Sequence, residues 1–311
     1  MANSSFSGPV RSKNGFKIYS EASSTGVDAD RTVHDLGIKD TRRYYLEEYF
    51  NHLPGTNADL ASTTESTNTP VNRSFEVLGT NHTSALATYA ATVAGMAMTT
   101  ATADADQMIV TPHLDTKQGA WAGTKWGTEN QVHWECGIRT SAAIDNQKIW
   151  AGLKLTNDQL PQTDANQAYF YFATDETVGQ VLSTYTPLYF IYSIAGADYL
   201  TNTGITVAAS TNYHLKITTD SDRKLSIFVN GEQYGLATTA TTTFDGTTSV
   251  TGTTQTTIDN RSQKSVALTD NIDLIPYIGI ENGDAAAAVL NVQFEAIKLI
   301  IVGTSPHYIF S

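Results

Sequence analysis

The chain is poor in cysteine, in charge and in long apolar stretches. Cys136 is the only cysteine among 311 residues, so no disulfide can form within the chain. No segment approaches the ~18 consecutive apolar residues of a membrane-spanning helix. The first sixteen residues also lack the apolar segment of a secretory signal peptide. We therefore expect a protein that does not enter a membrane and that folds in a cytoplasm.

Charged residues make up only 16% of the chain, against roughly a quarter in typical soluble domains. The net charge is −12, yet residues 1–43 carry seven Lys or Arg and only five Asp or Glu. The body is therefore acidic, which predicts repulsion of nucleic acid and of anionic membranes. The slightly basic head suits docking onto an acidic neighbour, although so small an excess can also be without function.

Apolar and polar residues alternate along much of the chain, which indicates strands with one buried face. Within 211–236 the apolar positions are Tyr213, Leu215, Ile217, Leu225, Ile227 and Val229. Asn230-Gly231 then supplies a two-residue turn with both residues at positive φ, so we predict a three-stranded antiparallel meander. Fourteen segments have strand character: 74–79, 84–91, 94–100, 107–112, 130–140, 147–156, 167–174, 187–195, 204–208, 211–219, 223–229, 232–238, 272–280 and 287–302. Two stacked antiparallel sheets are the expected fold.

Three regions follow from the local patterns. Residues 1–39 show neither strand nor helix periodicity, and we expect an extended N-terminal arm. Residues 40–70 are expected to form a short helix and a linker, with Asp40 as the N-cap of a helix from Thr41 to His52. Residues 71–311 form the β-sandwich, with a Thr-rich insertion at 238–257. The expected helix has one apolar stripe: Tyr45, Leu46, Tyr49, Phe50 and Leu53.

Two strands contain informative details. Cys136 is in phase with the apolar positions of its strand, which predicts a buried, unreactive thiol, whereas His133 and His214 fall on outward positions. In the last strand the apolar residues change parity, which indicates a β-bulge near Ala296. The residues on the two parities are Leu290, Val292 and Phe294, then Ile297, Leu299 and Ile301.

No constellation of residues has the spacing that catalysis requires. A glycosidase needs two carboxylates within about 5–10 Å, whereas Glu129 and Glu135 on one strand are roughly 20 Å apart. Three acid pairs with one intervening residue occur: Asp28/Asp30, Asp104/Asp106 and Asp220/Asp222. None has the third acid and turn glycine of a calcium loop, and the seven histidines lack zinc spacing. We predict a protein that is not an enzyme and has no metal site and no cofactor.

Two alternative functions stay open, one from aromatic residues and one from acids. Trp121 and Trp126 in GAWAGTKWGT are the best candidates for a platform that stacks on sugars, although packing is the commoner role of such rings. A carbohydrate-binding module is therefore one alternative. A glycosidase or lyase that uses acids such as Asp104 and Asp106 is the other.

Several stretches carry a resemblance to a known family. The opening NSSFSGPVRSKNGF resembles the N-terminal arm of structural proteins of tailed bacteriophages. SFEVLGTNHTSALATYAATVAGMAMTTATADADQMIVTPHL, TKWGTENQVHWECGIRT and IWAGLKLT resemble the lectin-type jelly-roll body that follows it there. YHLKITTDSDRKLSIFVNGEQYG and IDLIPYIGIEN are similar to concanavalin-like and laminin-G-like sandwiches. The resemblance implies an all-β, antiparallel jelly-roll or concanavalin-like sandwich in a capsid cement (decoration) protein, and it carries no catalytic residue.

This resemblance implies a structural role on the exterior of a phage head, after assembly in the host cytoplasm. The sandwich would self-associate as a homotrimer, while the arm clamps neighbouring major capsid proteins together. The arm residues expected to bind are Phe6, Val10, Arg11, Lys13, Phe16, Lys17 and Ile18. Because exposed ion pairs contribute only ~0–1 kcal/mol each, the apolar members should supply most of the binding free energy.

Overall fold

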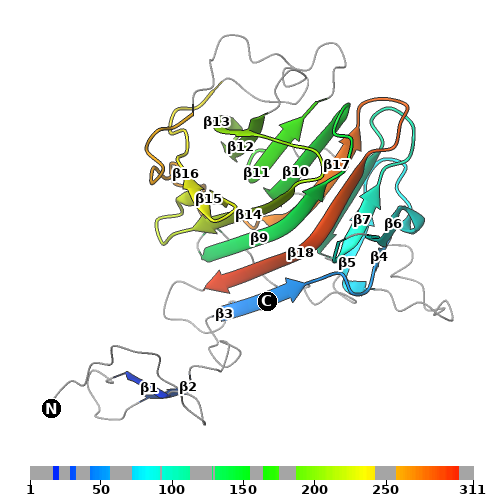
Figure 1. Ribbon diagram of the computed structural model, residues 1–311. Helices are drawn as coiled ribbons and strands as arrows, with labels where there is room; N and C mark the ends of the chain where they lie inside the picture. The colour runs from blue at the N-terminus through cyan, green and yellow to red at the C-terminus, as the bar shows by residue number, and fades with distance from the viewer. Residues whose placement is uncertain are drawn as a thin grey trace, which may run out of the picture.

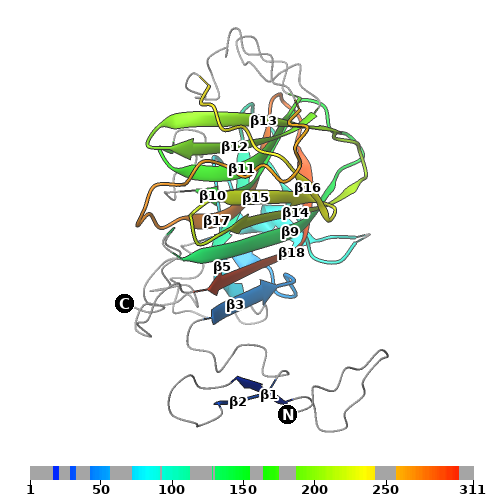
Figure 2. The ribbon, with the colours of Figure 1, turned by 90° about the vertical axis from the view of Figure 1, so that its left-hand side faces the viewer.

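Two stacked β-sheets form the body of the protein (Figures 1 and 2). The computed structural model describes residues 17–20, 29–32, 43–56, 72–91, 93–112, 128, 130–154, 164–174, 187–241 and 257–300. Each sheet of the body has eight strands, and all pairs are antiparallel except β4 with β5. The predicted two-sheet, all-β fold is confirmed.

Sheet 1 has the strand order β13-β12-β11-β10-β17-β8-β5-β4. Its strands are β4 (Pro54–Gly55), β5 (Asn72–Leu78), β8 (Gln107–Pro112), β10 (Gln147–Lys154), β11 (Gln167–Ala173), β12 (Pro187–Ile194), β13 (Ala197–Thr206) and β17 (Ile275–Asn282). Sheet 2 has the order β16-β15-β14-β9-β18-β7-β6, and β3 is a further partner of β18. Its strands are β3 (Arg43–Glu48), β6 (Ala87–Tyr89), β7 (Met96–Thr99), β9 (Gln131–Thr140), β14 (Asn212–Thr219), β15 (Leu225–Val229), β16 (Glu232–Tyr234) and β18 (Val289–Ile300).

The core lies between the sheets and is built from the inward positions of both. On β9 these positions are Val132, Trp134, Cys136 and Ile138, each at most 4% exposed. The alternation read from the sequence is therefore confirmed. Burial raises the pKa of the Cys136 thiol well above its ordinary value, so this thiol stays protonated.

The two sheets differ in how their outer faces are covered. On sheet 1 the outward side chains Trp150, Tyr169 and Tyr277 are also buried, and a buried ion pair joins Lys148 Nζ to Glu281 Oε1 at 2.5 Å. On sheet 2 the outward positions of β14 are exposed or half-buried. Among the described strands, side chains that can meet a partner therefore lie mainly on the outer face of sheet 2.

The helix expected over 41–52 is wrong, because residues 43–48 form β3 and pair with Glu295–Ile300 of β18. The apolar spacing there fits a period of two as well as 3.6, with Leu46 packed on the core and Tyr45 exposed. Hydrogen bonds to the free edge of β18 then favour the strand. The 3₁₀ turn η1 (Ser84–Leu86) is the only helical segment among the described residues. No helix in this part of the chain could cross a membrane.

Other details of the prediction can be compared with the structure. The meander β14-β15-β16 is confirmed, and Asn230 and Gly231 have φ values of 52° and 84°. The bulge in β18 exists, but it lies between Val292 and Phe294 rather than near Ala296. Within the expected extended arm, β1 (Lys17–Ser20) pairs with β2 (Ala29–Thr32), and Figures 1 and 2 show this pair apart from the sandwich. Of the Thr-rich insertion, residues 242–256 lie outside the described residues.

The shifted bulge turns a carboxylic acid into the core. Glu295 is 1% exposed and accepts a hydrogen bond of 2.7 Å from Trp134 Nε1. Burial raises its pKa to about 8, the bond from Trp134 opposes this, and the charge of Glu48 adds to it. Glu295 is therefore protonated at neutral pH in the folded protein.

The Glu295→Gln variant should be less sensitive to pH than the wild type. The folded state keeps a proton that the unfolded chain releases above about pH 4.5, so stability falls as the pH rises toward about 8. This group alone contributes a slope of about 1.4 kcal/mol per pH unit across that window. Urea unfolding at a series of pH values measures the slope. Parallel profiles for the variant and the wild type would show that Glu295 ionises normally.

Candidate binding surface on sheet 2

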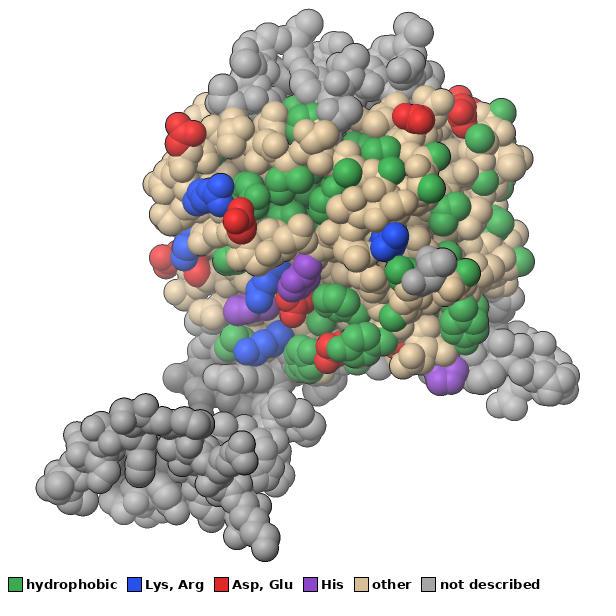
Figure 3. Space-filling view, in the orientation of Figure 1, with side chains coloured by type: hydrophobic (Ala, Val, Ile, Leu, Met, Phe, Trp, Pro, Cys, Tyr) green, Lys and Arg blue, Asp and Glu red, His purple; other side chains and the backbone are tan. Residues whose placement is uncertain are grey.

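The residues singled out from the sequence mostly fall outside the described part of the chain. Lys17 and Ile18 lie in β1. The others are not described: Phe6, Val10, Arg11, Lys13 and Phe16 of the arm, and Trp121 and Trp126 of the expected sugar platform. The structure instead draws attention to the outer face of sheet 2. In Figure 3, His, Lys and acidic side chains gather beside hydrophobic ones over β9, β18 and β3.

Two tyrosines stand out on this face because they are held in place while half exposed. Tyr45 on β3 is 51% exposed and Tyr49, just after β3, is 48% exposed. The Tyr45 hydroxyl donates to Glu47 Oε2 at 2.8 Å, and the Tyr49 hydroxyl donates to Glu47 Oε1. One carboxylate thus fixes the orientation of both rings.

Phe294 extends this aromatic surface toward β9. The bulge between Val292 and Phe294 turns the Phe294 ring outward, where it covers Gly137. A Cβ on Gly137 would lie 2.6 Å from Phe294 Cε1, so only glycine lets the ring lie this close to β9. The Phe294 ring centroid is 6.1 Å from that of Tyr49. We call Tyr45, Tyr49, Phe294 and Glu47 the tyrosine platform.

Polar groups border the platform on the side of β14. His214 Nε2 lies 2.9 Å from Glu135 Oε2, and Lys216 Nζ lies 3.8 Å from the same oxygen. His214 also contacts the Phe294 ring, with centroids 5.7 Å apart. These side chains offer both hydrogen-bond donors and acceptors next to the aromatic rings.

The arrangement suits binding better than catalysis. Glu47 and Glu135 are both register partners of Ala296, so their backbones lie about 10 Å apart on one face. Each carboxylate is already held by neighbouring hydroxyl or nitrogen groups, and Ala296, which lies between the two by register, is only 3% exposed. A glycosidase instead needs one carboxylic acid free to give a proton to the bond it cleaves.

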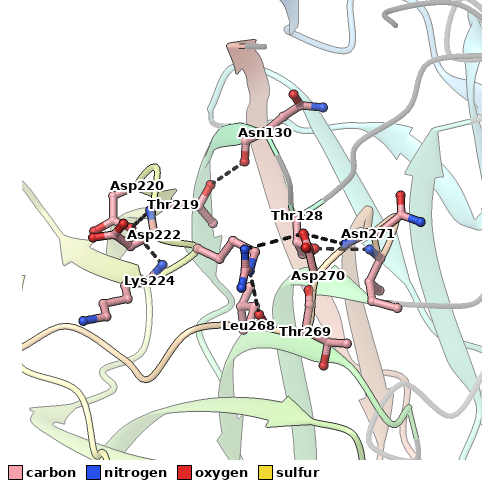
Figure 4. A network of polar contacts seen from close by, with 12 residues as sticks. Thr128, Asn130, Thr219, Asp220, Asp222, Lys224, Leu268, Thr269, Asp270 and Asn271 are labelled. Carbon is pink, nitrogen blue, oxygen red and sulfur yellow. Dashed lines mark hydrogen bonds and ion pairs between the residues drawn. The ribbon is translucent and has the colours of Figure 1, made fainter. Parts of the chain in front are cut away.

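Two of the acids considered from the sequence, Asp220 and Asp106, accept hydrogen bonds within the fold, whereas Asp28 lies outside the described residues. Asp220 Oδ1 accepts hydrogen bonds from the backbone N–H of Asp222 and of Lys224, both at 2.9 Å, within a tight turn (Figure 4). Asp106 accepts from Ala103 N at 2.7 Å and from Asn81 Nδ2 at 2.5 Å. No group of three metal-ligating side chains occurs among the residues that the structure describes.

Figure 4 also shows how polar contacts tie neighbouring loops together beside this turn. Arg223 Nε donates to the Leu268 carbonyl at 3.1 Å, and Thr128 Oγ1 donates to the Thr269 carbonyl at 2.5 Å. The hydrogen bonds and ion pairs drawn all join groups of this chain. This end of the sandwich is therefore a structural network, in which Asp220 and Asp222 contribute to the fold.

Sequence reasoning placed parts of the platform but not the whole. The outward positions of His133 and His214 were predicted correctly, since both follow from strand alternation. Tyr45 and Tyr49 were assigned to a helix, and Phe294 was expected on the inward parity. Only the pairing of β3 with β18, together with the position of the bulge, brings these rings to one face.

Comparison with known proteins gives the following. No protein-family model matches the sequence, and no curated protein matches it significantly. Similar solved structures include peanut lectin, with a TM-score of 0.46 and 10% identity over 84% of this chain and 99% of the lectin. The carbohydrate recognition domain of Emp46p has a TM-score of 0.42 and 10% identity, over 83% of this chain and 100% of that domain. A Bacteroides ovatus GH16 protein has a TM-score of 0.43 and 8% identity, over 82% of this chain and 99% of that protein. The likeness is one of fold alone.

The Glu47→Gln variant should lower the pKa of the Tyr45 hydroxyl. Partial burial, the hydrogen bond to Glu47, and the charges of Glu47 and Glu135 together raise this pKa to about 12. Removing the Glu47 carboxylate leaves burial in place, so the pKa should fall below 12 but stay above the ordinary 10.0. Tyrosinate absorbance during an alkaline titration measures it, with Tyr45→Phe to assign the signal. An unchanged value would mean that Glu47 does not hold the ring.

Proposed function

We propose that this protein is a non-enzymatic carbohydrate-binding protein that holds saccharides on the tyrosine platform. The observation that carries the proposal is a pair of half-exposed rings, Tyr45 and Tyr49, both fixed by Glu47. Large aromatic side chains are usually buried, so rings that are both exposed and oriented indicate a contact surface.

The chemistry of the platform matches that of a saccharide. A sugar ring presents C–H groups on its faces and hydroxyls around its rim, and a tyrosine presents an apolar face with a polar edge. Because Glu47 fixes both tyrosines, binding loses little of the ~0.5–1.5 kcal/mol that ordering each free side chain would cost. The Glu135 carboxylate and the His214 imidazole are placed to bond the hydroxyls of a sugar that lies on the rings.

Replacing Tyr45 and Tyr49 together with alanine should weaken saccharide binding roughly 10- to 100-fold, since each stacked ring contributes about 0.5–1.5 kcal/mol. A glycan array identifies the ligand, and titration calorimetry then measures the affinity. Both rings are half exposed, so the variant should unfold at nearly the wild-type temperature.

The matched control is Tyr89→Ala on the edge strand β6, where the ring is 57% exposed and its hydroxyl donates to the Asn51 carbonyl. This variant should bind like the wild type. Equal binding by the Tyr45/Tyr49 double variant and the wild type would refute the platform as the binding site.

A second candidate function is supported by the separation of β1 and β2 from the sandwich (Figures 1 and 2). On this proposal the arm, residues 1–39, clamps major capsid proteins on the exterior of a phage head, and the sandwich forms a homotrimer there. A segment that pairs with itself away from the core is available for contacts with another polypeptide.

Deleting residues 2–39 should leave the sandwich folded and abolish binding to capsids, because β3 and every strand of both sheets remain. Co-sedimentation with purified heads measures occupancy, and circular dichroism confirms the β-sandwich. Undiminished occupancy by the shortened protein would contradict the clamp. Particles that contain only about a dozen copies would instead place the protein in a tail or fibre.

A further inference from the structure

A cluster of basic side chains lies next to Tyr45 on the outer face of sheet 2. Lys298 of β18 is the register partner of His133 on β9 and of Tyr45 on β3. Lys216 of β14 lies close enough to affect the ionisation of His133, as Lys298 does. Like charges that face each other across strands repel, so the charged form of His133 is disfavoured beside these lysines unless an anion joins the cluster.

The acids nearest this cluster already have other partners. Glu135 Oε2 contacts His214 and Lys216, and Glu47 accepts the hydroxyls of Tyr45 and Tyr49. No carboxylate of the described residues lies within 4.0 Å of Lys298 Nζ or of the His133 ring. In a chain with a net charge of −12, two basic groups without an acidic partner on one exposed face are a specific feature.

We propose that His133, Lys298 and Lys216 form a subsite for the anionic group of an acidic saccharide, the carboxylate of a uronic acid or a sulfate ester. This inference rests on the proposed carbohydrate-binding function and names the class of sugar. The ring that carries the anion stacks on Tyr45, and its charged group reaches Lys298 beside it. Charge-assisted hydrogen bonds from lysine and protonated histidine are roughly twice as strong as neutral ones.

The ionisation of His133 makes binding depend on pH. Burial lowers the pKa of His133 below its ordinary 6.5, Lys298 and Lys216 lower it further, and Glu135 on the same strand opposes this. On the far side of β18 from His133, the strand β3 places Tyr45 beside Lys298. A bound anion favours the charged imidazole, so binding takes up a proton. Affinity should therefore rise as the pH falls toward the pKa of free His133.

Titration calorimetry with galacturonic acid trisaccharide and with neutral galactotriose tests the subsite. At about pH 6 the wild type should bind the acidic sugar about tenfold more tightly, and Lys298→Met should lose this preference while still binding galactotriose. Lys224→Met removes the same charge from an exposed position elsewhere and should keep the preference. In His133→Gln, the preference for the acidic sugar should no longer strengthen as the pH falls.

The outcomes separate this inference from the proposed function. Equal affinity for both sugars overturns the subsite and leaves the carbohydrate-binding proposal standing. Binding of neither sugar, together with no binding on the glycan array, refutes the carbohydrate proposal, and inorganic sulfate alone then tests the anion site. Sulfate should shift the NMR signals of the His133 ring in the wild type and not in Lys298→Met. No shift in the wild type, or pH dependence retained in His133→Gln, overturns the assignment of these residues.

Discussion

The bulge in β18 determines which side chains of this central strand of sheet 2 face the core. Leu290 and Val292 face the core before it, and Ile297 and Leu299 face the core after it, although the two pairs have opposite parity. Without the extra residue, one half of this twelve-residue strand would turn its apolar side chains to water. The same irregularity turns Phe294 outward. The tyrosine platform and the apolar core therefore depend on one backbone feature.

Most strands of the sandwich could be read from the sequence, and so could the difference between the two sheets. A strand covered on both faces reads as an unbroken apolar run, and QAYFYFA of β11 in sheet 1 does so. A strand with one wet face alternates, and NYHLKITT of β14 in sheet 2 does so. Alternation therefore predicted that Cys136 faces the core and that His133 and His214 face outward, and the Asn230-Gly231 pair located the hairpin.

The contacts between distant strands could not be read in the same way. The residues RYYLEEYF fit a helical stripe as well as a strand, and only the free edge of β18, some 250 positions later, selects the strand. The bulge was expected from the change of parity, yet parity alone does not specify the extra residue, and the structure has the register shift before Phe294, whose ring lies over Gly137. Register joins Tyr45, Lys298 and His133 from three strands, and no local pattern in the sequence specifies that pairing.

The acidity of the body is compatible with the proposed recognition of an acidic sugar. At physiological ionic strength the Debye length is about 8 Å, so most of the excess acids are screened from a ligand on sheet 2. Lys298 and His133 would touch the anion directly, and Tyr45 would shield one side of the contact from water. The acids nearest the subsite, Glu47 and Glu135, are held by hydroxyl, imidazole and ammonium groups, which spread their charge. Short-range contacts therefore outweigh the net charge, whereas a long polyanion such as nucleic acid would meet the acidic field of the whole body.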